Sequence, residues 1–160
     1  MHIIEGDARA AGYRFALVVS KYHEFVTDRL QAGALAALSA AGALSEGITV
    51  VRVPGAFEIP LAAQHLAESG RFDAIICLGC LIQGDTPHMG FIASAVADGL
   101  VAAAGATGVP ISFGVLTTNS MEQAMARAGE GPTNKGHEAA VAAIEMASVA
   151  AQLTRPAQPD

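Results

Sequence analysis

The chain has 160 residues, of which 52% are hydrophobic and 15% are charged, and its formal net charge is −6. A chain of this length fits one domain with one substantial core, the lack of a basic run argues against nucleic-acid binding, and the first residues lack the pattern of a signal peptide. Soluble domains usually carry about a quarter charged residues, so we expect a cytoplasmic protein that covers part of its surface in subunit contacts.

The first half of the chain alternates between strand-like and helical patterns. The apolar run 15–19 predicts a buried strand, and apolar residues at helical spacing over 30–38 predict a helix that stops near Gly42. The β-branched run 48–53 predicts the next strand. A helix is expected over about 58–68, with a proline in its first turn, where proline is tolerated.

A third strand is predicted over 73–82. Thr86 and Pro87 suit the N-cap and the first position of the helix that follows. The most apolar stretch, about 91–116, is interrupted by an aspartate, several glycines and Pro110. We therefore expect no membrane-spanning segment.

The last third of the chain continues the alternation. A fourth strand is expected over 109–116, and Ser120 is expected to cap a short helix. A last helix runs from about 134 to 153. The proline-containing tail, about 154–160, is predicted to be loose.

Strands that alternate with helices predict a parallel sheet covered on both faces. The expected fold is one α/β domain over 1–160, a three-layer αβα sandwich with a mainly parallel central sheet. Residues 2–5 are a candidate for an additional edge strand. Cys77 and Cys80 lie three positions apart on a predicted strand, so their sulfurs should point to opposite faces and have a structural role.

Unusual residues follow each predicted strand where it ends. Open α/β sheets bind ligands beyond the carboxyl ends of their strands. Four clusters there favour one composite site over scattered loops. The clusters are 21–23, 54–58, 83–88 and 117–119.

Several of these residues have chemistry suited to a site. The segment 84–87 leads into a helix whose free backbone N–H groups attract anions, and His88 on the next turn suits proton transfer near neutral pH. Arg127 and Lys135 could complete an anion site. Glu58 beside an aromatic residue suits a flat heterocycle that forms hydrogen bonds.

Five segments together resemble the 6,7-dimethyl-8-ribityllumazine synthase family, from residue 3 to the last helix. Each segment is weakly specific alone, but their order and spacing are specific. They are 24–30 (EFVTDRL), 54–60 (PGAFEIP), 84–88 (GDTPH), 113–118 (FGVLTT) and 123–129 (QAMARAG).

The resemblance implies a flavodoxin-like fold and an enzyme of riboflavin biosynthesis, a transferase that requires no metal or organic cofactor. It would condense 5-amino-6-(D-ribitylamino)uracil with 3,4-dihydroxy-2-butanone 4-phosphate to give 6,7-dimethyl-8-ribityllumazine, phosphate and water. The implied steps are formation of a Schiff base by the amine, loss of phosphate and ring closure. His88 would transfer protons.

The resemblance also implies which residues bind the two substrates. The pyrimidine and ribityl chain would be held by Tyr22, Ala56, Phe57, Glu58, Cys80, Leu81 and Ile82. The butanone phosphate would be held by Asp85, Thr86 and Arg127, with Lys135 nearby, and Phe113 would stack on the heterocycle from an adjacent subunit.

This sequence departs from the family pattern at several positions. Tyr22 stands where phenylalanine or tryptophan is frequent, and His23 replaces a frequent asparagine. Gln83 stands where arginine or lysine is common. The residues after His88 are Met-Gly-Phe in place of the usual aromatic–acid–aromatic pattern.

Two alternatives stay open at this point. One is the related archaeal-type riboflavin synthase, which takes two lumazines. The other is a non-enzymatic shell protein that binds flavin or lumazine at a decayed site. The complete GDTPH segment and Phe113 favour the synthase, and His88, Arg127 and Glu58 argue against decay.

The resemblance also implies a homopentamer with sites between neighbours, in which residues 3–5 join an adjacent sheet. The loop 128–134 is short, as in family members that build icosahedral shells of pentamers. An icosahedral shell is therefore favoured over a free pentamer or paired pentamers. The expected partners are small-molecule substrates and further copies of the chain, not nucleic acid or a membrane.

Overall fold

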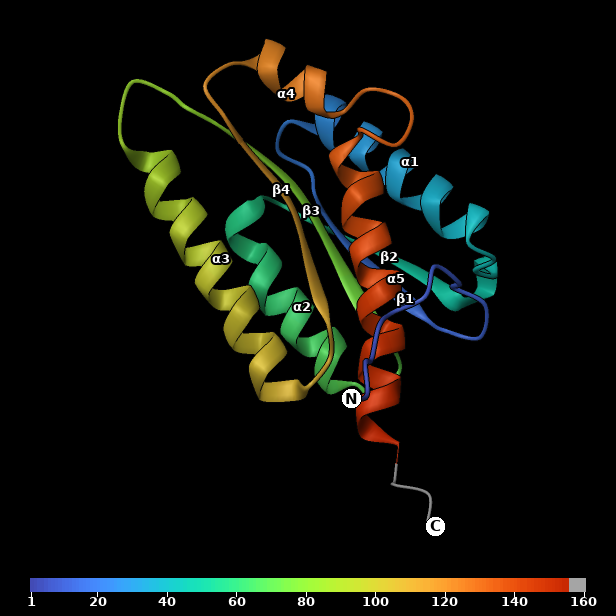
Figure 1. The fold of residues 1–160 in the computed structure, drawn as a ribbon. Helices are drawn as coiled ribbons and strands as arrows, with labels where there is room; N and C mark the ends of the chain where they lie inside the picture. The colour runs from blue at the N-terminus through green and yellow to red at the C-terminus, as the bar shows by residue number, and fades with distance from the viewer. Residues whose placement is uncertain (156–160) are drawn as a thin grey trace, which may run out of the picture.

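The structure, a computed structural model, describes residues 1–155. Its centre is a four-stranded sheet in the order β2-β1-β3-β4, and each neighbouring pair is parallel (Figure 1). This order is that of the flavodoxin-like sheets, so the predicted fold class is confirmed. The strands are β1 (Phe15–Ser20), β2 (Ile48–Val53), β3 (Ala74–Ile82) and β4 (Ile111–Thr118).

Helices cover both faces of the sheet. Side chains alternate along β1: Phe15, Leu17 and Val19 enter one core, whereas Ala16 and Val18 enter the other. The first core is closed by α1 (Glu24–Ala40), α4 (Met121–Arg127) and α5 (Lys135–Thr154), and the second by α2 (Ile59–Glu68) and α3 (His88–Thr107). Two short 3₁₀ helices, η1 (Ser45–Gly47) and η2 (Ala56–Glu58), flank β2.

Glycine lets the helices on each face approach closely. A Cβ atom at Gly136 in α5 would collide with the carbonyl group of Leu30 in α1, and one at Gly99 in α3 would lie 2.9 Å from Pro60 in α2. These contacts fix how α1 meets α5 and how α2 meets α3. Close packing between helices is therefore present on both faces.

The predicted start of α3 was wrong by one residue. Pro87, and not Thr86, is the N-cap, and no side chain caps the helix. The reason is local: the amide of Gln83 donates to the Thr86 carbonyl oxygen at 3.0 Å and so holds Thr86 in the loop. Strand β4 also lies two residues later than expected, because Pro110 has no N–H to donate to the ladder. By contrast, Ser120 caps α4 as predicted, accepting from the backbone N–H of Gln123.

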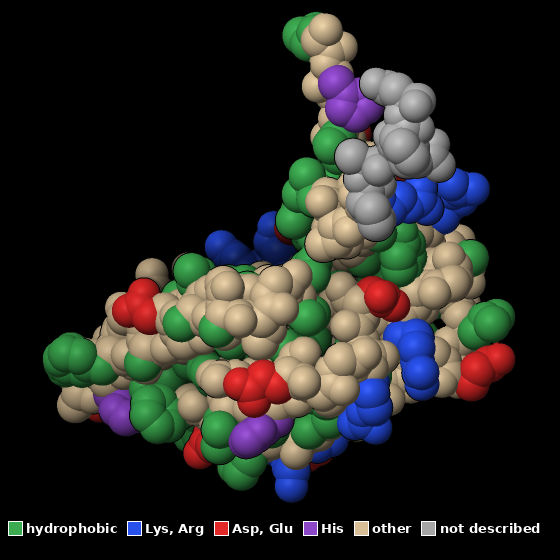
Figure 2. All heavy atoms as spheres, turned by 90° about the horizontal axis from the view of Figure 1, so that it is seen from below, with side chains coloured by type: hydrophobic (Ala, Val, Ile, Leu, Met, Phe, Trp, Pro, Cys, Tyr) green, Lys and Arg blue, Asp and Glu red, His purple; other side chains and the backbone are tan. Residues whose placement is uncertain are grey.

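The N-terminal segment packs on α5. Residues 2–5 form no strand within this chain. Instead the Glu5 carbonyl accepts from the amide of Gln152 at 2.8 Å, and the backbone N–H of Asp7 donates to the Ser148 hydroxyl. Met1 and Ile3 lie exposed beyond these contacts. Seen from below, a narrow arm projects from the body of the chain, and the charged side chains on this face are scattered among hydrophobic and other atoms (Figure 2).

Helix α5 extends through Thr154, one residue into the predicted loose tail, and residues 156–160 lie outside the described part of the chain. Among residues 1–155, α3 is the helix that is long and apolar enough, by length and composition, to cross a membrane, and 17% of that stretch is buried. Its Phe91 and Val101 are 73% and 74% exposed. Exposed apolar surface of this kind is typical of interaction sites.

Candidate active site

A cavity of about 510 Å³ lies beyond the carboxyl ends of β1, β2 and β3. Ligand pockets usually have volumes of roughly 300–1,000 Å³. Nine of the predicted site residues line this cavity: Tyr22, Ala56, Phe57, Glu58, Cys80, Leu81, Ile82, Thr86 and His88. His23, Gly55, Gly84, Met89 and Ile92 complete the lining.

The loop after β1 is held by its neighbours on both sides. Its backbone N–H groups at Lys21 and Tyr22 donate to the carbonyl groups of Val53 and Pro54, at the end of β2. The hydroxyl of Thr27 in α1 donates to the Ser20 carbonyl at 2.7 Å. The loop therefore presents the Tyr22 side chain to the cavity from a fixed backbone.

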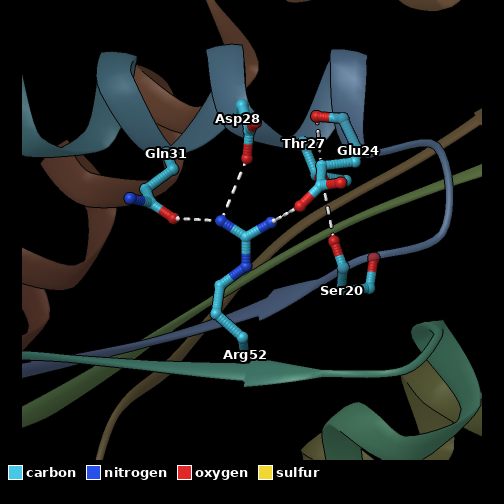
Figure 3. Close-up of polar contacts among 6 residues, drawn as sticks. All are labelled: Ser20, Glu24, Thr27, Asp28, Gln31 and Arg52. Carbon is cyan, nitrogen blue, oxygen red and sulfur yellow. Dashed lines mark hydrogen bonds and ion pairs between the residues drawn. The ribbon is translucent and has the colours of Figure 1, made fainter.

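Arg52 fastens the same loop from the edge of the sheet. Its guanidinium donates to Glu24 at 3.0 Å, to Asp28 at 2.9 Å and to Gln31 at 3.2 Å, all on the first turns of α1 (Figure 3). These contacts tie β2 to the start of α1. The loop after β1 runs directly into α1, so the contacts of Arg52 with α1 also fix the position of this loop.

His23 is the titratable residue in this cavity to which the sequence analysis gave no role. Among residues 1–155 it is the one non-glycine residue with a positive φ, 57°, a conformation that histidine adopts more readily than most residues. Its ring lies 4.5 Å from that of Tyr22. Burial lowers the pKa of the His23 imidazole, so the ring is mainly neutral near pH 7. Its position beside Tyr22 at a strand end was the available signal.

His88 enters the cavity from the first residue of α3. The loop before it is braced by the amide of Gln83, which donates to the carbonyl groups of Gly84 and Thr86. His88, Thr86 and Gly84 all line the cavity, whereas Asp85 is exposed and does not. Gly84 and Thr86, and not Asp85, therefore border the space where a ligand would sit.

Three more of the predicted residues line a second cavity, of about 620 Å³, between β4 and α5, and Asp85 lines neither cavity. Phe113, half-exposed on β4, lies here with Arg127 and Lys135. The guanidinium of Arg127 donates to the Gln123 carbonyl, and the Lys135 ammonium pairs with Glu138 at 2.8 Å. No residue lines both cavities. The single chain thus divides the predicted site into two separate groups.

Both cysteines are buried, and they enter different cores, as the strand spacing predicted. Burial raises the pKa of both thiols, that of Cys80 to about 11. At pH 8 only about one Cys80 thiol in a thousand is then a thiolate, the reactive form. We expect neither thiol to react with a disulfide reagent in the native protein and both to react after unfolding. Rapid labelling of one thiol before unfolding would contradict this.

The comparisons with known proteins agree with the motifs. The family model for 6,7-dimethyl-8-ribityllumazine synthase matches residues 12–151. A relative from Desulfatibacillum aliphaticivorans, named 6,7-dimethyl-8-ribityllumazine synthase, is 47% identical over 151 residues. The alignment covers 94% of this chain and 97% of the relative.

Proposed function

The chain belongs to the 6,7-dimethyl-8-ribityllumazine synthase family, and on that premise we propose that each active site joins the first cavity of one subunit to the second cavity of its neighbour. The chain catalyses the condensation of 5-amino-6-(D-ribitylamino)uracil with 3,4-dihydroxy-2-butanone 4-phosphate in riboflavin biosynthesis. One observation carries the proposal: Tyr22 and His88 line one cavity and Phe113 and Arg127 the other, with no residue in common.

The first cavity suits the pyrimidine. Phe57 and Tyr22 offer aromatic faces at its rim, and Glu58 offers a carboxylate that accepts from ring N–H groups. Leu81 and Ile82 are the last residues of β3, so their backbone can meet a flat ring at the end of the sheet. A neighbour's Phe113 would close the stack from the opposite side.

The phosphate is held between subunits. The neighbour's Arg127 and Lys135 supply positive charge, and the backbone N–H groups around Gly84 and Thr86 supply donors beside the start of α3. Asp85, whose carboxylate would repel the dianion, lies outside the lining of the first cavity. This arrangement places the butanone beside the amine of the pyrimidine.

His88 is the proton carrier in this site. The amine nitrogen attacks the ketone carbon, and both amine protons move in turn by way of the imidazole to the carbonyl oxygen, which leaves as water to give the Schiff base. Loss of a carbon-bound proton then lets phosphate leave with the C–O electron pair. The ribitylamino nitrogen closes the second ring with loss of water. Holding the two substrates together in the correct orientation supplies much of the rate enhancement over the uncatalysed reaction.

The proposed assembly is a cytoplasmic homopentamer, built further into an icosahedral shell. The low charge of the chain and the exposed apolar side chains of α3 support large contacts between copies. Thr49 and Val50 are exposed on the edge strand β2, where residues 3–5 of a neighbour can add. The mass of the native particle tests this: a fully active monomer or dimer would overturn the shared site, and a stable pentamer would overturn only the shell.

Arg127→Ala is expected to raise the Michaelis constant for the butanone phosphate by about 10–100-fold. A charge-assisted hydrogen bond contributes roughly 1.5–3 kcal/mol, and each 1.4 kcal/mol is about tenfold in affinity. The constant for the pyrimidine should change by less than about twofold, because that substrate binds the other cavity. Steady-state kinetics with each substrate varied in turn measures both.

The matched control is Arg71→Ala, which removes an exposed arginine from outside both cavities. It should leave both Michaelis constants unchanged. Equal increases in the two constants for Arg127→Ala would remove Arg127 from phosphate binding.

A further inference from the structure

The side chain of Asn134 joins three segments that are far apart in sequence. Its amide nitrogen donates to the carbonyl of Arg29 in α1 at 3.1 Å and to that of Gly129 at 2.8 Å. Its carbonyl oxygen accepts from the backbone N–H groups of Gly136 and His137, at 2.8 and 3.1 Å. An asparagine amide has two N–H donors and two acceptor positions, so every one is in use.

The surroundings leave this side chain no other position. Asn134 is 3% exposed. A Cβ atom at Gly33 in α1 would collide with the Asn134 side chain, and one at Gly136 would collide with the Leu30 carbonyl. The amide therefore lies at a close contact between α1 and α5, and the two glycines leave it little room to shift.

The hydrogen bonds of Asn134 fix both ends of the loop that separates the two cations of the second cavity. Gly129 comes two residues after Arg127, and Gly136 comes one residue after Lys135. Between these ends, the loop contains Gly131 with φ +85° and exposed residues at 130–133. The Asn134 side chain is thus the polar link that holds the exit of α4 against the start of α5.

Capping α5 requires only the acceptor half of this side chain. A serine or an aspartate caps a helix start about as well as asparagine does. The two N–H donors reach beyond the cap, to α1 and to the loop. This second half of the amide needs a separate explanation.

We propose that Asn134 is a positioning residue, which sets the spacing of Arg127 and Lys135 so that both cations meet one phosphate group. The inference rests on the proposed function, because it takes the second cavity as the phosphate half of the site. Displacements of about 1 Å at a reacting centre can cost up to about 10²-fold in rate, so spacing on this scale matters for binding and orientation.

Asn134→Asp tests the proposal with the shape and the cap retained. Aspartate keeps the acceptor for Gly136 and His137 but loses both donors, and its second oxygen faces two carbonyl groups. We expect the Michaelis constant for the butanone phosphate and the dissociation constant of inorganic phosphate to rise by roughly tenfold. The Michaelis constant for the pyrimidine should stay within about twofold.

Asn134→Ser, which caps without a charge, should shift the same two constants in the same direction. Leu38→Ala, which truncates a buried side chain of α1 that lines neither cavity, is the control for lost stability. It should lower the melting temperature without changing either Michaelis constant. Equal changes in both constants for the Asn134 variants, or a lower kcat alone, would overturn the proposal. Suppose that Arg127→Ala raises only the Michaelis constant for the butanone phosphate, whereas the Asn134 variants raise both constants equally. The proposed role of Asn134 is then wrong, and the proposed function stands.

A measurement on the unaltered protein covers the case in which neither variant folds. Binding of inorganic phosphate should slow hydrogen exchange at the backbone amides of Gly136 and His137 by at least severalfold, because these donate to Asn134. If saturating phosphate left the exchange rates of these two amides unchanged, the hydrogen bonds of Asn134 would not be coupled to phosphate binding, and the proposal would be wrong.

Discussion

His88→Ala is expected to slow lumazine formation by about 10²–10⁴-fold, the range of general acid–base catalysis, while the fold and assembly stay intact. The residue is exposed at the first position of α3 and belongs to neither core, so truncating it leaves no cavity in the interior. Some activity should remain, because the other side chains still bring the two substrates together. Turnover at saturating concentrations of both substrates measures the loss.

His65→Ala is the matched control, since His65 is an exposed histidine on α2 outside both cavities. It should retain full turnover. Circular dichroism and particle mass must match the unaltered protein for all variants. A folded His88→Ala enzyme with unchanged turnover would remove His88 from the mechanism.

Mixing two inactive variants is expected to restore activity. If subunits of His88→Ala and Arg127→Ala assemble at random in equal amounts, about a quarter of the sites receive an intact first cavity and an intact second cavity, because each proposed site takes its two cavities from neighbouring subunits joined head to tail. Each variant alone should be nearly inactive at low concentrations of the butanone phosphate. Activity after the two are unfolded and refolded together, compared with the sum of the separate preparations, measures the restoration.

The control for mixing pairs two changes in the same cavity. His88 and Phe57 both line the first cavity, so His88→Ala and Phe57→Ala together can never complete a site. Their mixture should only average the separate activities. If the His88 and Arg127 variants also merely average, although mass measurement shows that they have mixed, the shared site is wrong.

The sequence was sufficient for the architecture because strands and helices are set by local periodicity. The alternation that buries Leu17 on one face and Val18 on the other is present in the order of residues along the chain. Helix ends were less predictable. Thr86 has the chemistry of an N-cap, but the side chain of Gln83 competes for its carbonyl group, and such a contact cannot be read from propensity.

The candidate residues were identified by chemistry and resemblance, but their division into two cavities was not. That division follows from β4 being at the edge of the sheet, which puts Phe113 on the far side from Tyr22. Strand order is a property of the tertiary fold. Asn134 was missed for a similar reason, because its bond to Arg29 spans 105 positions of the sequence.

Arg52 also bears on how a newly made subunit avoids aggregation. Strand β2 is an edge with a free ladder of N–H and C=O groups, and such an edge can pair wrongly with strands of other chains. A short edge that carries a charged side chain is a poor template for such pairing. Strand β2 has only six residues, and Arg52 is its charged side chain. Three acceptors on α1 hold the Arg52 guanidinium in place. The arginine that ties the loop after β1 to α1 therefore also makes this short edge strand a poor template for pairing with strands of other chains.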